Sequence, residues 1–324
     1  MDSKFKWLDF KVTNRCNNRC IYCGVIQDAP CTPEKVNGDS IKETIRDAVG
    51  AGFSHFAFLG GEPSIRVDLP ECLETLATAK SVESAMVITN MLEFNESLYR
   101  AIFASAARHA QVVASIDNLS APNYKHQDPV LTQQRIGAIA SIANEYKYLG
   151  KREVHVHSVI SRENLGGIID HVSHFSGRQI DVSLALVEPF AIRSNARAFN
   201  EFSPAEIDGI VAQLDELERR GMLNWANKVL RRYIVEYRSI GASLRSECTA
   251  GHDHVVIESD GNVYPCLTES YRKGLRYGNI ASERFGDIYR RMQGFRCESP
   301  FQQTCWDHYL WTKLDRLVGG HDDV

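Results

Sequence analysis

Three cysteines stand close together near the N-terminus, within the stretch VTNRCNNRCIYCGV at residues 12–25. Cys16, Cys20 and Cys23 have the spacing C-x3-C-x2-C. Three thiolates are one ligand short of a closed tetrahedral zinc site, and zinc sites favour cysteines in C-x2-C pairs. A four-iron, four-sulfur (4Fe–4S) cluster takes four ligands, so three thiolates leave one iron open to a small molecule. The triad therefore favours such a cluster over a zinc knuckle with a borrowed fourth ligand.

A second group of cysteines lies in the last third of the chain. Four thiolates can ligate a further cluster completely, whereas a structural zinc ion or buried free thiols are the alternatives. Of the nine cysteines, Cys31 and Cys72 belong to neither group. Cys72 has the spacing of a core residue on a helix, and Cys31 follows the triad in a loop. The second group consists of Cys248, Cys266, Cys297 and Cys305.

The bulk composition is that of a globular protein. The chain has 324 residues, of which 44% are hydrophobic and 24% charged, with a net charge of −4. This balance predicts neither nucleic-acid nor membrane binding through bulk electrostatics. No apolar run approaches the roughly 18 residues of a membrane span, and the first residues carry charges where a signal peptide is apolar. We therefore expect a cytoplasmic location, where thiols stay reduced and cysteines serve metals or catalysis.

Strand-like and helix-like segments alternate up to about residue 190. Such alternation predicts parallel strands with right-handed crossovers, and six units predict a partial (β/α)6 barrel. Periodicity alone leaves an open doubly wound sheet as the alternative. The predicted strands cover residues 5–12, 55–60, 85–89, 111–117, 153–160 and 181–187, with helices between them.

Polar residues on two of these strands point to a cavity inside the barrel. In EVHVHS, Val154 and Val156 alternate with Glu153, His155 and His157; in VVASID, three apolar residues alternate with Val113, Ser115 and Asp117. A strand covered by helices turns its apolar set outward. The polar set then faces the interior, as an open barrel with a cavity requires.

The rest of the chain predicts a helical segment and a small C-terminal unit. Residues 201–245 have helical spacing, with Ser203 as N-cap and Pro204 at the first helical position. The stretch HVVIESDGNVYPC reads as a hairpin with Asp260-Gly261 at its turn. We expect a barrel at 1–200, a helical connector at 201–246 and an auxiliary iron–sulfur domain at 247–324.

These motifs together resemble the radical S-adenosylmethionine (radical SAM) enzymes. The triad has an aromatic residue, Tyr22, before its third cysteine, and the segment LGGEPSI at residues 59–65 resembles the family's glycine-rich motif after the second strand. The resemblance implies that Cys16, Cys20 and Cys23 bind a 4Fe–4S cluster and that SAM occupies the open iron. It covers roughly residues 5 to 190.

The resemblance also implies which residues meet SAM. Gly60 and Gly61 let the backbone approach a ligand closely, and Glu62 accepts a hydrogen bond from the SAM ammonium group. VVASID resembles the fourth-strand segment that meets the ribose, through Ser115 and Asp117. Asn90, at the end of the third predicted strand, is a further candidate of the same type.

The C-terminal cysteines resemble those of the SPASM and twitch domains. In these auxiliary domains, a hairpin ending in DG-x-x-x-PC brings in the second cluster ligand. This chain lacks the cysteines for two auxiliary clusters, so it resembles the shorter twitch form with one 4Fe–4S cluster. The x7 spacing between Cys297 and Cys305 is looser than in either form.

The resemblance implies radical chemistry on a substrate that the sequence does not name. The compact twitch enzymes of aminoglycoside biosynthesis act on polar rings, and Glu153, His155, His157, Glu188 and Arg193 would suit hydroxyls and amines. Dehydrogenation of an alcohol needs a base, for which His155, His157 and Glu188 are candidates. We therefore expect an oxidoreductase that dehydrogenates a sugar or aminocyclitol, with a flavodoxin-type or ferredoxin-type electron donor.

Three other functions stay open. A sugar epimerase would need a cysteine hydrogen donor, for which Cys31 is the candidate. A peptide-modifying enzyme commonly carries a leader-binding domain ahead of the barrel, for which the triad at residue 16 leaves no room. A non-catalytic iron–sulfur electron carrier would have no use for the glycine-rich motif or the polar strand faces.

Overall fold

The computed structural model describes residues 5–20, 23, 35–119, 128–186, 202–240 and 248–297. Five of the residues named above lie outside these described residues: Tyr22, Cys31, Glu188, Arg193 and Cys305. The same holds for residues 305–318, whose sequence predicts a short helix. No helix in the described part is long and apolar enough to cross a membrane.

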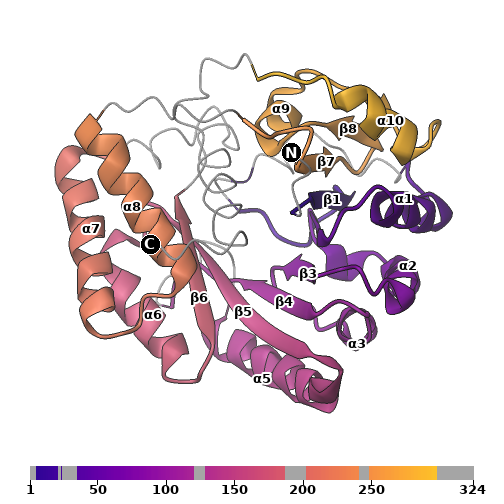
Figure 1. The fold of residues 1–324 in the computed structure, drawn as a ribbon. Helices are drawn as coiled ribbons and strands as arrows, with labels where there is room; N and C mark the ends of the chain where they lie inside the picture. The colour runs from indigo at the N-terminus through magenta and orange to yellow at the C-terminus, as the bar shows by residue number, and fades with distance from the viewer. Residues whose placement is uncertain are drawn as a thin grey trace.

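Six parallel strands follow one another across the sheet in chain order, as the sequence predicts. Each neighbouring pair is hydrogen-bonded in parallel, and helices lie along the outside of the sheet (Figure 1). The fold is the expected partial barrel. Its strands are β1 (Trp7–Thr13), β2 (His55–Gly60), β3 (Ser84–Thr89), β4 (His109–Ser115), β5 (Lys151–Ile160) and β6 (Asp181–Leu186).

The helices of the barrel begin at side chains that cap them. Asn37 accepts a hydrogen bond from Ser40 N, Asn95 caps the third helix in the same way, and Asp128 caps the next one. Such caps satisfy the free N–H groups of a helix's first turn. The helices are α1 (Gly38–Gly50), α2 (Leu69–Leu73), α3 (Glu96–Phe103), α5 (Pro129–Glu145) and α6 (Ile168–Ser176), with short 3-10 turns between them.

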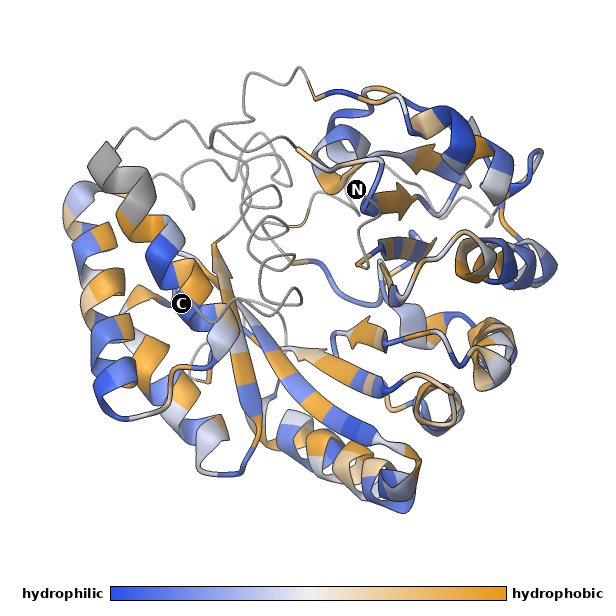
Figure 2. Ribbon diagram, in the orientation of Figure 1, coloured by the Kyte–Doolittle hydropathy of each residue, from blue (hydrophilic) through white to orange (hydrophobic). Residues whose placement is uncertain are grey.

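The apolar face of each strand lies under these helices. Val112, Ala114 and Ile116 belong to the buried hydrophobic core, as does Val156 on β5. The residues between them face the barrel interior, as the alternation predicts. Figure 2 shows this exchange of hydrophobic and hydrophilic residues along β5 and β6.

The barrel ends at β6 because a helix pair covers its open edge. α7 (Pro204–Arg219) starts with the predicted Ser203 cap and Pro204, and α8 (Trp225–Ile240) packs against β6. Asn227 on α8 accepts from Leu184 N at 2.8 Å and donates to Val182 O at 2.8 Å. An amide side chain that pairs both backbone groups replaces a seventh strand there. The predicted boundaries of this connector at 200 and 246 fall outside the described residues.

The C-terminal unit continues the sheet beyond β1. β7 (His254–Ile257) pairs in parallel with β1, and β8 (Asn262–Tyr264) returns antiparallel through the predicted turn, where Gly261 has φ +88°. The hairpin was predicted from the sequence, but its pairing with β1 was not. β9 (Gly278–Asn279), α9 (Leu267–Arg272) and α10 (Phe285–Met292) complete this unit, which lies beside β1 and α1 (Figure 1).

Candidate active site

The first cysteine loop begins directly after β1. Arg15 N donates to Thr13 Oγ1 at 3.0 Å, which turns the chain at the end of the strand. The Cys16 thiol then follows, and Cys23 N donates to Cys20 O at 3.2 Å. The carboxyl ends of barrel strands are where such enzymes place their chemistry, and the structure puts the loop at that edge.

Two N–H groups are directed at the Cys16 sulfur. Asn18 N lies 3.3 Å from Cys16 Sγ and Asn90 Nδ2 lies 3.7 Å from it. Burial raises the pKa of the Cys16 thiol, and Glu62 and Cys23 raise it further. A bound cation is what would stabilise the thiolate here, and N–H donors to the sulfurs are among the groups that tune iron–sulfur clusters. These residues therefore fit the predicted cluster.

The described residues do not form a site for a single metal ion. Among them, no group of three or more His, Cys, Asp or Glu residues lies close enough to hold one ion. A four-iron cluster carries each thiolate on a different iron. Its ligands are therefore spread over a wider cage than those of a zinc ion.

Gly60 and Gly61 are required by the chain itself. A Cβ on Gly60 would lie 2.2 Å from Thr13 O, and one on Gly61 would lie 2.1 Å from Arg15 O. Gly61 N donates to Thr13 O at 2.7 Å, and Glu62 N donates to Arg15 O at 2.8 Å. We predicted that these glycines make room for a ligand. That role stays a prediction, and the structure shows in addition that their missing side chains make room for the start of the cysteine loop.

Glu62 binds the glycine-rich segment to the end of β3. Its carboxylate accepts from Ser64 N at 2.9 Å, Thr89 Oγ1 at 2.7 Å and Asn90 N at 2.6 Å. The side chain is buried, and burial raises the pKa of Glu62 despite these donors. A carboxylate has about four acceptor positions, so one remains for the predicted SAM ammonium group. That contact stays a prediction.

Asn90 joins the glycine-rich segment to the cysteine loop. Its side-chain amide donates to Asn17 Oδ1 at 2.8 Å as well as to the Cys16 sulfur. Its backbone N–H is held by Glu62. The structure thus brings together Gly60, Gly61, Glu62 and Asn90 beside Cys16, and the sequence assigned all five to one site.

The predicted polar residues of β4 and β5 form rows across the barrel interior. Ser115, the last residue of β4, pairs with His157, which in turn pairs with Ser183 on β6. His157 Nδ1 lies 2.9 Å from Ser183 Oγ, a hydrogen bond that orients the ring. Asp117 is buried and accepts from Val159 N at 2.9 Å. These residues lie toward the same end of the barrel as the cysteine loop.

Glu153 and His155 lie deeper in the barrel. Glu153 pairs with Gln111 and accepts from its amide at 3.0 Å. It lies four residues before His157, or about 13 Å farther from the carboxyl end of the sheet. Burial lowers the pKa of His155, so its ring is neutral at pH 7. Their depth argues against direct contact with a substrate that SAM also contacts.

The C-terminal cysteines converge as the sequence predicts for the described members. The thiols of Cys248 and Cys297 share a hydrogen bond, which raises the pKa of Cys248, and burial raises it further. Cys266 lies near enough to raise that pKa as well, and its own sulfur accepts from Glu269 N at 3.4 Å. These three sulfurs lie close together at a partly buried position, where the charge of a bound metal centre would stabilise their thiolates. They fit a second cluster.

Cys72 is a core residue, as its helical spacing predicts. Its side chain is fully buried on α2, and burial raises the pKa of the thiol to about 11. A raised pKa makes this thiol a poor nucleophile, and its burial in the core fits a packing role.

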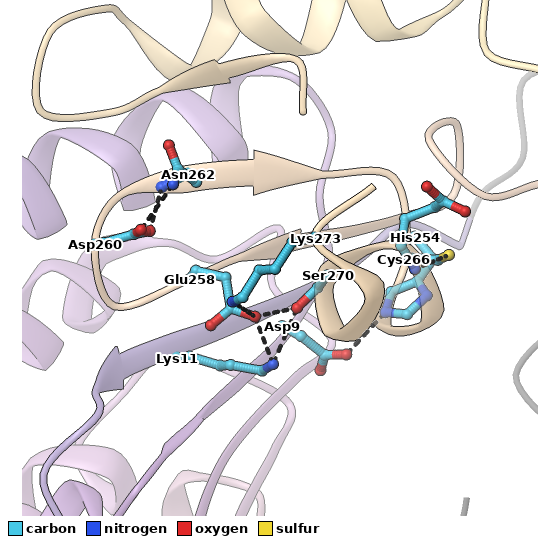
Figure 3. Close-up of polar contacts among 10 residues, drawn as sticks. Asp9, Lys11, His254, Glu258, Asp260, Asn262, Cys266, Ser270 and Lys273 are labelled. Atoms are coloured by element: carbon cyan, nitrogen blue, oxygen red, sulfur yellow. Dashed lines mark hydrogen bonds and ion pairs between the residues drawn. The ribbon is translucent and has the colours of Figure 1, made fainter. Parts of the chain in front are cut away.

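A polar network that was not predicted from the sequence lies between β1 and β7. Lys11 and Glu258 form a buried ion pair at 2.7 Å, and Asp9 accepts from His254 Nε2 at 2.8 Å (Figure 3). The signal was present, since Asp9 and Lys11 interrupt an apolar strand at a spacing of two residues. What could not be predicted was the partner strand.

Two family models match the chain. One, for the radical SAM superfamily, matches residues 10–130, and one for the iron–sulfur cluster-binding SPASM domain matches residues 248–307. The PqqA peptide cyclase of Xanthomonas euvesicatoria is 24% identical over 301 residues, which cover 91% of this chain and 76% of that protein. A GTP 3′,8-cyclase of Stenotrophomonas maltophilia is 35% identical over 89 residues, 26% of this chain and 27% of that protein.

A solved structure shares the fold across nearly the whole chain. The crystal structure of Streptococcus suis SuiB bound to its precursor peptide SuiA matches with a TM-score of 0.63 and 17% identity. The match covers 92% of this chain and 69% of that chain.

The matches and the site define a class. The chain carries a radical SAM domain at residues 10–130 and a C-terminal SPASM iron–sulfur domain at residues 248–307. More particularly, it is a radical SAM enzyme whose two domains imply SAM and two 4Fe–4S clusters.

Proposed function

We propose that this enzyme is an oxidoreductase that removes two hydrogen atoms from its substrate. When bound, SAM and its cluster supply the 5′-deoxyadenosyl radical, and the auxiliary cluster supplies an electron acceptor. The observation that carries the proposal is the convergence of Cys248, Cys266 and Cys297 in a domain that shares a sheet with the cysteine loop of β1.

The proposal assigns seven cysteines to the two clusters. Cys16, Cys20 and Cys23 would hold the SAM-binding cluster and leave one iron open. Cys248, Cys266, Cys297 and the predicted Cys305 would hold the auxiliary cluster. In a reducing cytoplasm, where we expect the enzyme, a flavodoxin-type or ferredoxin-type protein would supply the electron that splits SAM.

The favoured substrate is a small polar molecule, of the sugar or aminocyclitol type, that is oxidised at an alcohol carbon. The carbon loses a hydrogen atom to the radical, and the hydroxyl loses a proton and the remaining electron as the ketone forms. His157 is the candidate base, because Ser183 holds its ring on the interior face near the carboxyl ends of the strands. Glu188 stays a second candidate base and Arg193 a candidate substrate residue, whereas the depth of Glu153 argues against that role.

Oxidation of a residue in a peptide is the second candidate. It is favoured by the similarity to a PqqA peptide cyclase over 91% of the chain. The fold shared with SuiB, which was crystallised with its precursor peptide, agrees with this candidate. A peptide would enter the same barrel and meet the same radical, so the two candidates differ in substrate rather than in catalytic residues.

Anaerobic turnover with reductant and SAM tests the proposal. Reconstituted enzyme should form 5′-deoxyadenosine and a product lighter by two hydrogen atoms, measured by mass spectrometry with panels of sugars, cyclitols and peptides. Substrate deuterium incorporation from solvent without that loss would instead indicate an epimerase, and Cys31→Ala would then abolish it. An enzyme that binds two clusters but never cleaves SAM would be an electron carrier, and the proposal would be wrong.

A further inference from the structure

A buried lysine of the barrel, Lys11, lies against the auxiliary domain. We propose that Lys11 is a positioning residue that holds Cys266, and through it the auxiliary cluster, in place against the strand that leads to the first cysteine loop. The inference rests on the proposed function, since it takes Cys266 as a cluster ligand.

Lys11 is surrounded by the auxiliary domain although it belongs to the barrel. Its side chain is 2% exposed, and Nζ lies 2.7 Å from Glu258 Oε1 and 3.1 Å from Ser270 Oγ. It also lies 4.2 Å from the centre of the Tyr271 ring. Glu258 and Ser270 are themselves buried and hydrogen-bonded to each other. The three polar groups are therefore hydrogen-bonded to one another (Figure 3).

The network reaches a predicted cluster ligand through one short helix. Ser270 and Tyr271 lie on α9. The Cys266 sulfur caps the N-terminus of this helix by accepting a hydrogen bond from Glu269 N. Cys266 lies at the end of β8, beside the first residues of β7 (Figure 3). Movement of α9 away from Lys11 would therefore also move the sulfur.

The network also reaches the first cysteine loop through one strand. Lys11 lies two residues before Thr13, at whose backbone the glycine-rich segment is anchored. Both residues belong to β1, although the register of this strand with β2 shifts between them. One buried cation thus connects the positions of both predicted cluster sites.

Charge explains why lysine is needed. Burial raises the pKa of Glu258, but the charge and hydrogen bond of Lys11, together with Ser270 and Lys273, bring the pKa below its usual value. Without Lys11, the carboxylate would be a buried charge beside Ser270, and among the described residues its remaining cationic neighbour is Lys273 Nζ, at 3.9 Å. A buried charge left without its partner is costly. We expect α9 to move, or Glu258 to take up a proton, and either change alters the electrostatic field at Cys266.

The experiment compares cluster potentials in the full-length holoenzyme. Lys11→Met removes the charge and keeps the length of the side chain. Ser270→Ala removes only the hydroxyl group through which Lys11 is hydrogen-bonded to α9. Iron content and redox titrations followed by electron paramagnetic resonance are measured anaerobically for each. We expect Lys11→Met to change the reduction equilibrium of the auxiliary cluster at least tenfold, about 59 mV for a one-electron couple. Ser270→Ala should shift it in the same direction by less.

Two controls separate positioning from a general loss of stability. Lys42→Met removes another lysine ion pair, with Glu71, on the surface, and should leave both potentials unchanged. Lys11→Arg retains the cation and should keep the auxiliary equilibrium within about threefold of the wild type. If Lys11→Met does not fold, the shift in the reduction potential of the auxiliary cluster in Ser270→Ala tests the proposal by itself.

The outcomes distinguish this inference from the proposed function. If wild-type enzyme binds only one cluster, the proposed function and this inference are both wrong. If it binds two, and neither Lys11→Met nor Ser270→Ala moves the auxiliary potential, only the role of Lys11 is overturned. A shift of equal size in Lys42→Met would also overturn it.

Discussion

At the residue scale, the side chain with the best claim to proton transfer is His157. It lies in the row that faces the barrel interior, and its hydrogen bond with Ser183 keeps one ring nitrogen in a set orientation. General bases typically contribute a hundredfold to ten-thousandfold. Position in the row, rather than residue type, separates it from His155, which lies deeper.

We predict that His157→Gln lowers kcat for substrate oxidation at least about a hundredfold. SAM cleavage without substrate should change little, because His157 does not contact the cysteine loop in the described residues. The measurement is the ratio of oxidised product to 5′-deoxyadenosine. Glu153→Gln is the matched control, and it should retain activity within about twofold. Equal losses in both variants would point to a packing role for the row.

His55 gives a pH-dependent prediction at the same scale. Its ring packs against Phe5, and burial lowers its pKa to about 4, an effect to which His109 adds. Between pH 6.5 and 4 the unfolded chain therefore binds a proton that the folded protein does not. We expect the free energy of unfolding to fall by up to about 3 kcal/mol as the pH drops through this range.

The measurement is urea unfolding of the holoenzyme at several pH values. His55→Phe keeps an aromatic ring and removes the titration, so its stability should fall less between pH 7 and 4. His252→Gln, at a partly exposed position of the auxiliary domain, should follow the wild type. If the free energy of unfolding of His55→Phe and of the wild type fell equally with pH, the assignment of this pH dependence to His55 would be wrong.

At the element scale, the open edge of β6 explains why six strands suffice. Asn227 pairs with the Leu184 N–H and, together with Asn224, with the Val182 C=O at that edge, and it is 1% exposed. The α7 and α8 pair therefore belongs structurally to the barrel as well as linking it to the auxiliary domain. A barrel edge without such cover would be a site for aggregation.

We predict that Asn227→Ala destabilises the enzyme by about 2 kcal/mol, because the buried Leu184 N–H loses its partner, whereas Val182 O keeps the hydrogen bond from Asn224. Urea denaturation gives the change, and hydrogen exchange should become faster at the Leu184 amide. Lys228→Ala, an exposed neighbour on α8, should alter stability by less than about 0.5 kcal/mol. Unchanged protection of Leu184 would mean that the edge is covered in another way.

At the whole-molecule scale, the auxiliary domain is a continuation of the barrel sheet. The β1–β7 pairing and the buried Lys11–Glu258 pair give the two domains one sheet and a shared polar interior. Domains joined by small polar interfaces move relative to each other by default. A shared sheet removes that freedom, and it would keep the distance between two bound clusters constant.

We predict that the auxiliary domain unfolds together with the barrel. Amides of Val255 and Ile257 in β7 should exchange hydrogen as slowly as Phe10 in β1, because opening one strand exposes the other. Calorimetry of the holoenzyme should show a single transition. A first transition that releases only the amides after residue 247 would show that the domains unfold separately.

Much of the architecture was predictable from local patterns. The six barrel strands, the Ser203 cap and the hairpin turn at Gly261 were each predicted from a few neighbouring residues, because period-two alternation and capping chemistry are local. The convergence of Gly60, Glu62 and Asn90 on Cys16 was predicted by resemblance to a family whose strands share one edge. The pairing of β7 with β1 could not be predicted, since it joins residues that are almost 250 positions apart.

The sequence by itself determined the class of chemistry, because thiol spacing and a glycine-rich motif are local properties that survive any arrangement of the remaining chain. Only the tertiary structure decided what the individual polar residues do. In the structure, the two glycines allow close backbone packing, and Lys11 pairs with Glu258. His157 lies nearer than Glu153 to the carboxyl ends of the barrel strands. These roles depend on which strand lies next to which, and a buried polar group takes its role from the partner that satisfies it.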